Sequence, residues 1–177
     1  MRIAVGSDHA GYRLKRAMGR ELARLGHDVL DLGCGSDRTR VDYPDYAVRV
    51  ARAVATGRCA RGVLACGTGI GMAMAANKVR GIRAAVCWDV LSARLAGEHN
   101  AANVLCVGGR MVTAVRGAAM LRAWLNALPK GGRHARRVRK IMALEKAGGL
   151  KAAPTRDKPR IGTRERVRST RRVHVRG

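Results

Sequence analysis

Short runs of consecutive apolar residues alternate with amphipathic stretches over the first 150 residues, and this alternation limits the possible folds. Runs such as Val63-Leu64-Ala65 are apolar at every position, which is typical of strands covered by helices on both faces. The stretches between them place apolar residues at helical spacing, as at positions 14, 18, 22 and 25. We expect strands at 2–5, 28–32, 62–66, 82–87 and 104–107, and helices at 12–25, 45–56, 71–78, 89–97, 111–128 and 134–147. Such alternation predicts parallel βαβ units with right-handed crossovers, and therefore an α/β fold: a three-layer, Rossmann-like α/β/α arrangement with a five-stranded parallel sheet.

Chain length and residue classes exclude several other kinds of protein. A length of 177 residues suits one domain, and a hydrophobic share of 47% excludes a chain that is disordered throughout. No run of 18 apolar residues exists, so we expect no membrane span, and the N-terminus lacks the apolar stretch of a signal peptide. Five cysteines without a CxxC pair argue against a disulfide framework and a structural zinc site. Reduced thiols in a cytoplasm are the expectation.

The formal net charge of +24 indicates an anionic partner: nucleic acid, a phosphate metabolite or an anionic membrane. Residues 151–177 hold ten Lys or Arg and two acidic residues without an apolar period, which predicts a disordered basic tail after a domain at 1–150. Nucleic-acid binding is disfavoured as the main function, because Phe is absent and residues 125–177 contain no Trp or Tyr for base stacking. Weak, salt-sensitive binding of a polyanion by the tail stays a secondary expectation.

Polar and glycine-rich segments follow three of the expected strands, at the edge of the sheet where such folds bind ligands. These segments are Ser7-Asp8-His9, Cys66-Gly67-Thr68-Gly69 and Gly108-Gly109-Arg110. The second segment continues to Gly71 and exposes backbone N–H groups at a helix start, which favours negative charge. A cysteine in that position can act as a base or a nucleophile. The alternatives are a tight turn and a small buried cysteine.

Two further candidate groups lie later in the chain. His99-Asn100 falls in the connection before the last expected strand. Arg133 and Arg137 are four residues apart at the start of the last helix, so they share a face that suits a phosphate. The alternatives are a capped surface histidine and an ordinary solvated basic face. No ligand-spacing motif accompanies the histidines, so no metal is expected.

Motifs spread over residues 1–147 match one family in order. They are Gly6-Ser-Asp8-His9-Ala-Gly11, Asp42-Tyr43-Pro44-Asp-Tyr46, Cys66-Gly-Thr-Gly-Ile-Gly71, Ala76-Asn77-Lys78, Gly81-Ile-Arg83-Ala84, His99-Asn100, Asn103-Val104-Leu105, Gly109-Arg110 and Gly132-Arg133-His134 with Arg137. With this combination the chain resembles the ribose-5-phosphate isomerase B type of sugar-phosphate isomerases, a group that also contains allose- and galactose-6-phosphate isomerases. The tail from 151 has no counterpart in the family pattern.

The resemblance implies an aldose–ketose isomerase without metal or cofactor, acting as a homodimer or a dimer of dimers with shared active sites. Ribose 5-phosphate and ribulose 5-phosphate would interconvert through a cis-enediolate, and a six-carbon sugar phosphate is the alternative substrate. The catalytic residues it implies are Cys66 as the base, His99 for ring opening and Thr68 at the enediolate. Its substrate-binding residues would be Asp8, His9, Tyr43, Gly67, Gly69, Gly71, Asn100, Arg110, Arg133 and Arg137, with Arg110 reaching in from the partner subunit.

Overall fold

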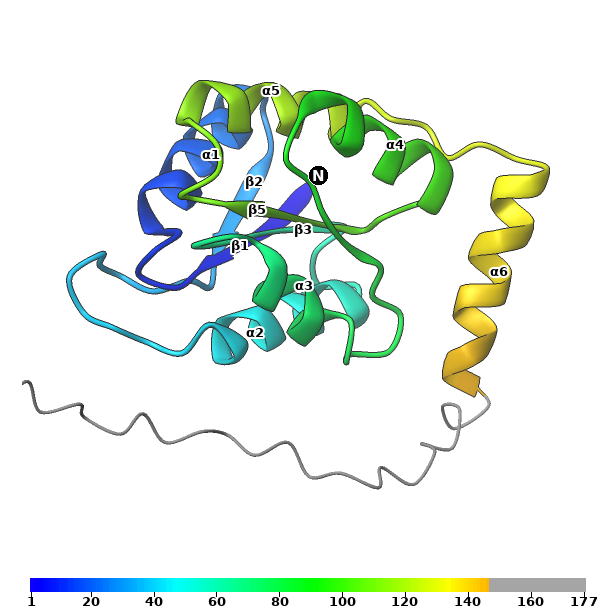
Figure 1. Ribbon diagram of the computed structural model, residues 1–177, viewed down its shortest axis with the longest axis horizontal. Coiled ribbons are helices and arrows are strands. Elements are labelled where there is room, and N and C mark those ends of the chain that lie inside the picture. The colour runs from blue at the N-terminus through cyan, green and yellow to red at the C-terminus, as the bar shows by residue number, and fades with distance from the viewer. Residues whose placement is uncertain (147–177) are drawn as a thin grey trace, which may run out of the picture.

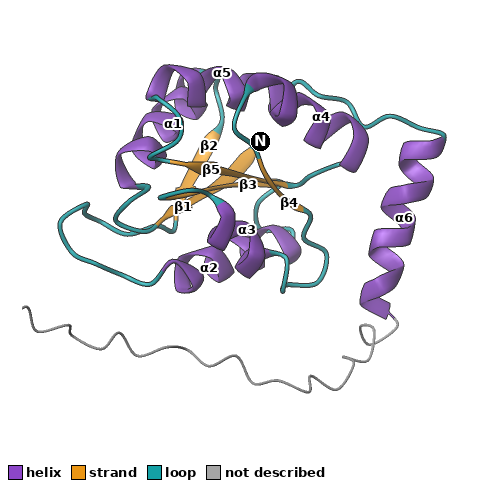
Figure 2. Cartoon of the chain, in the orientation of Figure 1, coloured by secondary structure: helices purple, strands orange, loops and turns teal. Residues whose placement is uncertain are grey.

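The computed structural model describes residues 1–146, which form a parallel sheet of five strands and six helices (Figures 1 and 2). The elements are β1 (Arg2–Ser7), α1 (Tyr12–Arg24), β2 (Asp28–Asp31), α2 (Tyr43–Ala55), β3 (Arg61–Cys66), α3 (Ile70–Ala76), β4 (Ala84–Val86), α4 (Val90–Asn100), β5 (Val104–Gly108), α5 (Ala114–Leu125) and α6 (Arg133–Lys146). The strand order is β2-β1-β3-β5-β4, and every pair is parallel. This confirms the predicted three-layer α/β fold. The expected basic tail at 151–177 lies outside the described residues.

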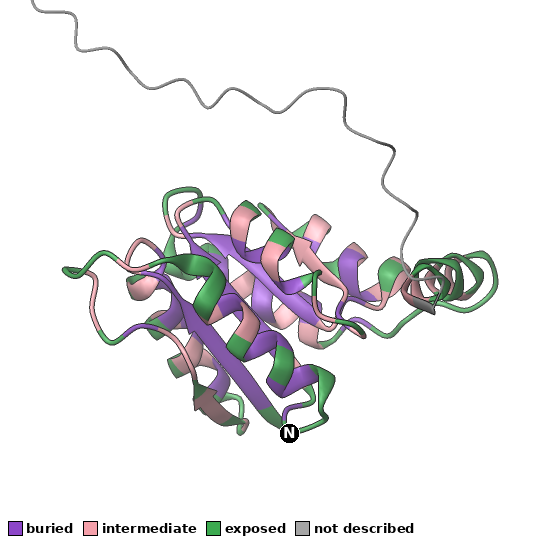
Figure 3. Cartoon of the chain, turned by 90° about the horizontal axis from the view of Figure 1, so that it is seen from below, coloured by how far each residue is buried: buried purple, intermediate pink, exposed green. Residues whose placement is uncertain are grey.

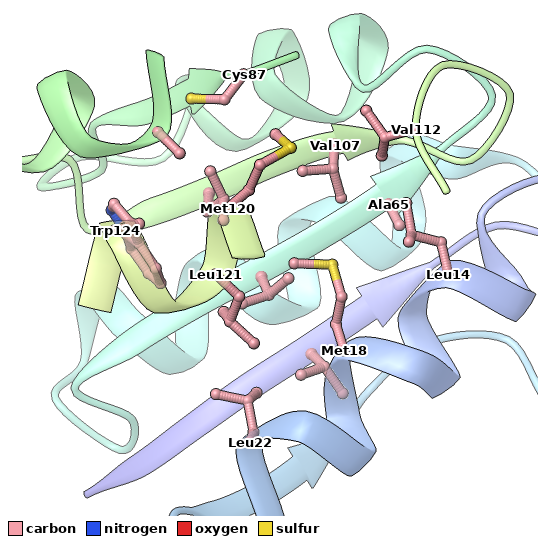
Figure 4. Close-up of a cluster of buried hydrophobic side chains, with 14 of the residues drawn as sticks. Leu14, Met18, Leu22, Ala65, Cys87, Val107, Val112, Met120, Leu121 and Trp124 are labelled. Atoms are coloured by element: carbon pink, nitrogen blue, oxygen red, sulfur yellow. The ribbon is translucent and has the colours of Figure 1, made fainter. Parts of the chain in front are cut away.

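Helices cover both faces of the sheet, because successive strand residues point to opposite sides. On one face Ile3 and Val63 pack with side chains of α1, α4 and α5, among them the fully buried Trp124 (Figure 4). On the other face Ala4 and Leu64 pack with α2 and α3. The three central strands β1, β3 and β5 are largely buried, whereas α6 is mostly exposed (Figure 3) and packs beside α4. Within residues 1–146 no helix is long and apolar enough to cross a bilayer.

The strand order places a crevice between the carboxyl ends of β1 and β3. The chain leaves β1 toward α1 on one face of the sheet and leaves β3 toward α3 on the other face. Diverging connections of neighbouring strands open the crevice in which doubly wound folds bind ligands. The structure therefore brings the segments that begin at Asp8 and at Gly67 together at one place.

One predicted boundary was wrong in a way that concerns the site. Helix α4 continues through Asn100, so His99 and Asn100 form its last turn rather than the connection before β5. The helix ends at Ala101, whose φ of 46° lies in the left-handed region. Gly97, where the sequence suggested an end, stays within the helix because it packs closely against Ala127.

Candidate active site

The loop after β1 closes tightly over the end of β3. A Cβ atom on Gly11 would lie 2.2 Å from the carbonyl oxygen of Ala65, so only glycine permits this approach. The Asp8 carboxylate is buried and accepts a hydrogen bond of 2.9 Å from the Gly11 backbone N–H through Oδ1. Within residues 1–146 its Oδ2 accepts no hydrogen bond.

Cys66 stands at the end of β3 with its sulfur among the glycines of the next loop. The Gly69 backbone N–H donates to Cys66 Sγ at 3.1 Å, and Gly69 adopts a φ of +86° that favours glycine. An N–H donor of this kind stabilises a thiolate. Burial raises the pKa of the Cys87 thiol to about 11 and the pKa of the Cys106 thiol well above its usual range. Those two thiols therefore stay protonated near neutral pH and cannot serve as bases.

The loop after β5 completes the crevice from the other side of β3. Backbone N–H groups of Gly109 and Arg110 donate to the carbonyls of Cys66 and Gly67 at 2.7 and 3.0 Å. The Arg110 guanidinium lies over Gly67 of its own chain, 3.4 Å from where a Cβ atom would stand. The β5 loop thus directs Arg110 toward the crevice of its own chain, and its reach into the site of a partner subunit stays a prediction.

Tyr43 covers the start of α3 from the side of α2. A Cβ atom on Gly71 would lie 2.6 Å from Tyr43 Cζ, so the aromatic ring packs directly on this glycine. The tyrosine is 40% exposed, and its ring forms part of the wall beside the glycine loop. Thr68 is exposed within that loop, where its Oγ1 accepts a hydrogen bond of 3.4 Å from the Ile70 N–H.

A basic pocket of about 470 Å³ opens at the same edge of the sheet. It is lined by His9, Arg40, Val41, Asp42 and Arg110. The Val41 backbone N–H donates to His9 Nδ1 at 3.3 Å, which joins the loop before α2 to the loop after β1. Arg40 and Asp42 were not among the predicted site residues. They lie in the long loop that follows β2, several residues after the end of the strand, so no adjacent strand marked them.

The remaining predicted residues gather around the junction of α4 and α6. The rings of His99 and His134 stack with centroids 4.1 Å apart, and the Lys130 N–H donates to the Glu98 carbonyl at 2.7 Å. Desolvation and then the neighbouring cationic side chains lower the pKa of His134, so its ring is neutral near pH 7. Arg133 and Arg137 are both exposed at the start of α6.

These two groups of residues lie at opposite edges of the sheet. Cys66 is level with Gly108 at the carboxyl end of β5, whereas Asn103, just after α4, bonds to Gly62 at the amino end of β3. Four residues of strand separate these levels by about 13 Å. Figure 1 likewise shows α6 on the side of the molecule away from the loop between β2 and α2. The structure thus brings Asp8, His9, Tyr43, Cys66 and Arg110 together and keeps His99, Asn100, Arg133 and Arg137 apart from them.

The fold and the crevice define a doubly wound α/β enzyme with its chemistry at the switch point of the sheet. Among residues 1–146 no three His, Cys, Asp or Glu side chains form a group that could hold a metal ion. The family model described as Ribose/Galactose Isomerase matches residues 3–141, and the chain belongs to this family.

Individual relatives match this chain over nearly their whole length. Ribose-5-phosphate isomerase B of Escherichia coli K12 is 46% identical over 144 residues, which are 81% of this chain and 96% of the relative. The structure of ribose-5-phosphate isomerase B from Clostridium thermocellum is 48% identical, with a TM-score of 0.81 over 84% of this chain and all of that chain. The Mycoplasma genitalium isomerase B with bound ribulose-5-phosphate is 41% identical, with a TM-score of 0.78 over 82% of this chain and 96% of that chain. The chain is thus an isomerase similar in sequence and fold to ribose-5-phosphate isomerases of type B.

Proposed function

We propose that this chain interconverts ribose 5-phosphate and ribulose 5-phosphate, with Cys66 as the base. The observation that carries the proposal is the position of Cys66 Sγ, 3.1 Å from the Gly69 N–H in the crevice between β1 and β3. The substrate follows from the relatives, which are ribose-5-phosphate isomerases, one of them with bound ribulose-5-phosphate.

The reaction moves one proton between two adjacent carbons of the open-chain sugar. The Cys66 thiolate takes the proton from C2, the electron pair of that bond forms the C1–C2 double bond, and negative charge passes to the C1 oxygen. The C1 oxygen takes up a proton and the C2 hydroxyl gives one up. The Cys66 thiol then returns the proton to C1, which leaves a carbonyl at C2. A positioned base of this kind contributes about 10²–10⁴ in rate.

The loop after Cys66 stabilises the enediolate formed between the two proton transfers. Backbone N–H groups of Gly67 and Gly71, together with the Thr68 hydroxyl, are the donors for its two oxygens, while the Gly69 N–H donates to Cys66 Sγ. The free carboxylate oxygen of Asp8 accepts a hydrogen bond from a sugar hydroxyl. At the far end of the substrate, His9 and Arg110 bind the phosphate, which holds the reacting carbons against Cys66.

A second copy of the chain completes the site in this proposal. His99 for ring opening, Asn100 for a hydroxyl, and Arg133 and Arg137 for the phosphate all lie away from Cys66 of their own chain. A two-fold dimer presents the α4–α6 end of each subunit to the crevice of the other, so a homodimer has two complete sites. The exposed apolar side chains of α6, Ile141 (42% exposed) and Leu144 (52%), beside a cavity of about 500 Å³, suit such a contact.

Replacement of the base tests the proposal. We expect Cys66→Ala to lower the rate of ribose 5-phosphate isomerisation by about a hundredfold or more, because the positioned base for the C2 proton is lost. Cys59→Ala is the matched control, since Cys59 is also buried but lies outside the crevice. Equal rates for Cys66→Ala and wild type would show that Cys66 is not the base. Faster turnover of allose 6-phosphate than of ribose 5-phosphate by wild type would assign the six-carbon substrate instead.

A further inference from the structure

We propose that Arg40 is a phosphate-binding residue of this isomerase, in addition to those that the family motifs indicate. The inference rests on the proposed function, because it places the substrate phosphate in the pocket beside His9 and Arg110. Arg40 lines that same pocket of about 470 Å³ from the loop between β2 and α2. The pocket therefore holds two guanidinium groups from one chain.

The loop that carries Arg40 is attached to the rest of the fold along its length, so Arg40 is held at the pocket in the free enzyme. At its start, the Cys34 N–H donates to the Ser7 carbonyl at 2.9 Å, and buried Lys15 donates to the Cys34 carbonyl at 2.9 Å. In its middle, Arg13 and Asp37 form an ion pair of 2.7 Å. An anchored binding group loses less conformational entropy when the ligand arrives.

The third attachment, between Val41 and His9, fixes the imidazole as well as the loop. Since His9 Nδ1 accepts the Val41 N–H, the ring proton of the neutral imidazole lies on Nε2. The neighbour of Arg40 thus makes His9 a hydrogen-bond donor through Nε2. Loop and histidine then supply donors to one pocket from two sides.

The charges of the pocket also suit a phosphate ester. Arg40 and Arg110 form no salt bridge within the described part of the chain. Asp42 is the single carboxylate of the lining, so two cations and one anion face the pocket when His9 is neutral. A phosphate dianion more than neutralises the net positive charge of the pocket. Each guanidinium group can bind two phosphate oxygens at once. Asp42 is left to accept a hydrogen bond from a sugar hydroxyl.

The comparison of Arg40→Gln with Arg38→Gln tests the role of Arg40. Both substitutions remove one positive charge from the same exposed loop, but only Arg40 lines the pocket. We expect Arg40→Gln to raise the KM for ribose 5-phosphate and the inhibition constant of inorganic phosphate by about tenfold, and Arg38→Gln to change both by less than twofold. Arg40→Lys keeps the positive charge but cannot bind two phosphate oxygens at once as a guanidinium does. Its KM and its inhibition constant for phosphate therefore fall between those of wild type and Arg40→Gln.

Calorimetric titration of each variant with inorganic phosphate separates this inference from the proposed function. If wild type isomerises ribose 5-phosphate while both glutamine variants share its KM and phosphate affinity, Arg40 does not bind phosphate and the proposed function stands. If wild type does not isomerise ribose 5-phosphate, the proposed function is wrong, and the titration alone decides about Arg40. A thermal unfolding midpoint common to all variants confirms that the exposed substitutions leave the fold unchanged.

Discussion

Lys15 is a buried cation whose contacts hold the loop that presents Arg40. Its side chain is 2% exposed, and its Nζ lies 2.8 Å from Asp31 Oδ2 and 2.9 Å from the Cys34 carbonyl oxygen. Asp31 is half exposed and can be hydrated when unpaired, whereas the Cys34 carbonyl is buried with its residue. The main cost of losing Lys15 is therefore the unpaired carbonyl and the freed loop.

We expect Lys15→Met to lower the free energy of unfolding by about 2 kcal/mol and to raise the KM for ribose 5-phosphate, since the loop of Arg40 loses one of the two contacts that hold its start. Urea unfolding and steady-state kinetics of the same preparation measure both effects. Arg16→Met is the matched control, because Arg16 is exposed on the same helix and its loss should change stability by less than about 0.5 kcal/mol. Equal stability of the two variants would contradict a structural role for Lys15.

Among single residues, those within compact sequence motifs could be predicted as parts of the site. Asp8, His9 and the segment from Cys66 to Gly71 could be placed, because each directly follows a strand whose apolar run was evident. Lys15 and Arg40 could not be placed. Lys15 contacts residues 16 and 19 positions away, and Arg40 acts beside His9 across 31 positions. Contacts between residues so far apart in the sequence produce no local sequence pattern from which they could be predicted.

Among the helices, α4 shows how packing overrides helix propensity. Gly97 lies inside α4, although glycine costs about 1 kcal/mol relative to alanine in a helix. A Cβ atom at this position would lie 2.5 Å from the Cβ of buried Ala127, just after the end of α5. Close approach of the two helices thus requires glycine. This contact is long-range, which is why the sequence suggested a helix end at 97 while the other element positions were predicted well.

The same contact predicts opposite effects for two Gly→Ala substitutions in helices. We expect Gly97→Ala to lower the free energy of unfolding by about 1–3 kcal/mol, because the added methyl group forces α4 and α5 apart. Gly19→Ala in α1 is the control, since the nearest atom there, Val29 Cγ1, is 4.0 Å away and the helix propensity of alanine should add about 0.5–1 kcal/mol. Chemical denaturation of both variants measures these changes. Stabilisation by Gly97→Ala would show that the helices are not in close contact.

For the whole molecule, the division of the predicted site residues between two edges of the sheet is the main structural result. The order of the motifs along the chain does not predict this division. His99, Arg110 and Arg133 all follow Cys66 in the sequence, but only Arg110 lies beside Cys66 in the structure. Strand direction decides it: a residue before a parallel strand and a residue after one lie at opposite edges. Net charge was equally uninformative, because Arg40 and Arg110 contribute to one pocket and Arg133 and Arg137 to a separate surface.

A shared site predicts that two inactive variants restore each other when combined. The first variant is Cys66→Ala, and the second carries His99→Ala with Arg137→Ala. Each alone has two defective sites per dimer. In a mixed dimer, Cys66 of the second chain faces His99 and Arg137 of the first, so one of the two sites is complete. Coexpression with two different affinity tags and purification on both isolates the mixed species, whose activity we expect to be about half that of wild type.

The alternative geometry predicts a different result in the same experiment. If each site were built from a single chain, every site of the mixed dimer would contain a defect, and its activity would equal the mean of the two parents. Two wild-type chains with the same tags set the value for full activity and show that the tags do not disturb the dimer. Mixed dimers as inactive as their parents would therefore place the complete site within one chain, despite the separation of Cys66 from His99 along the sheet.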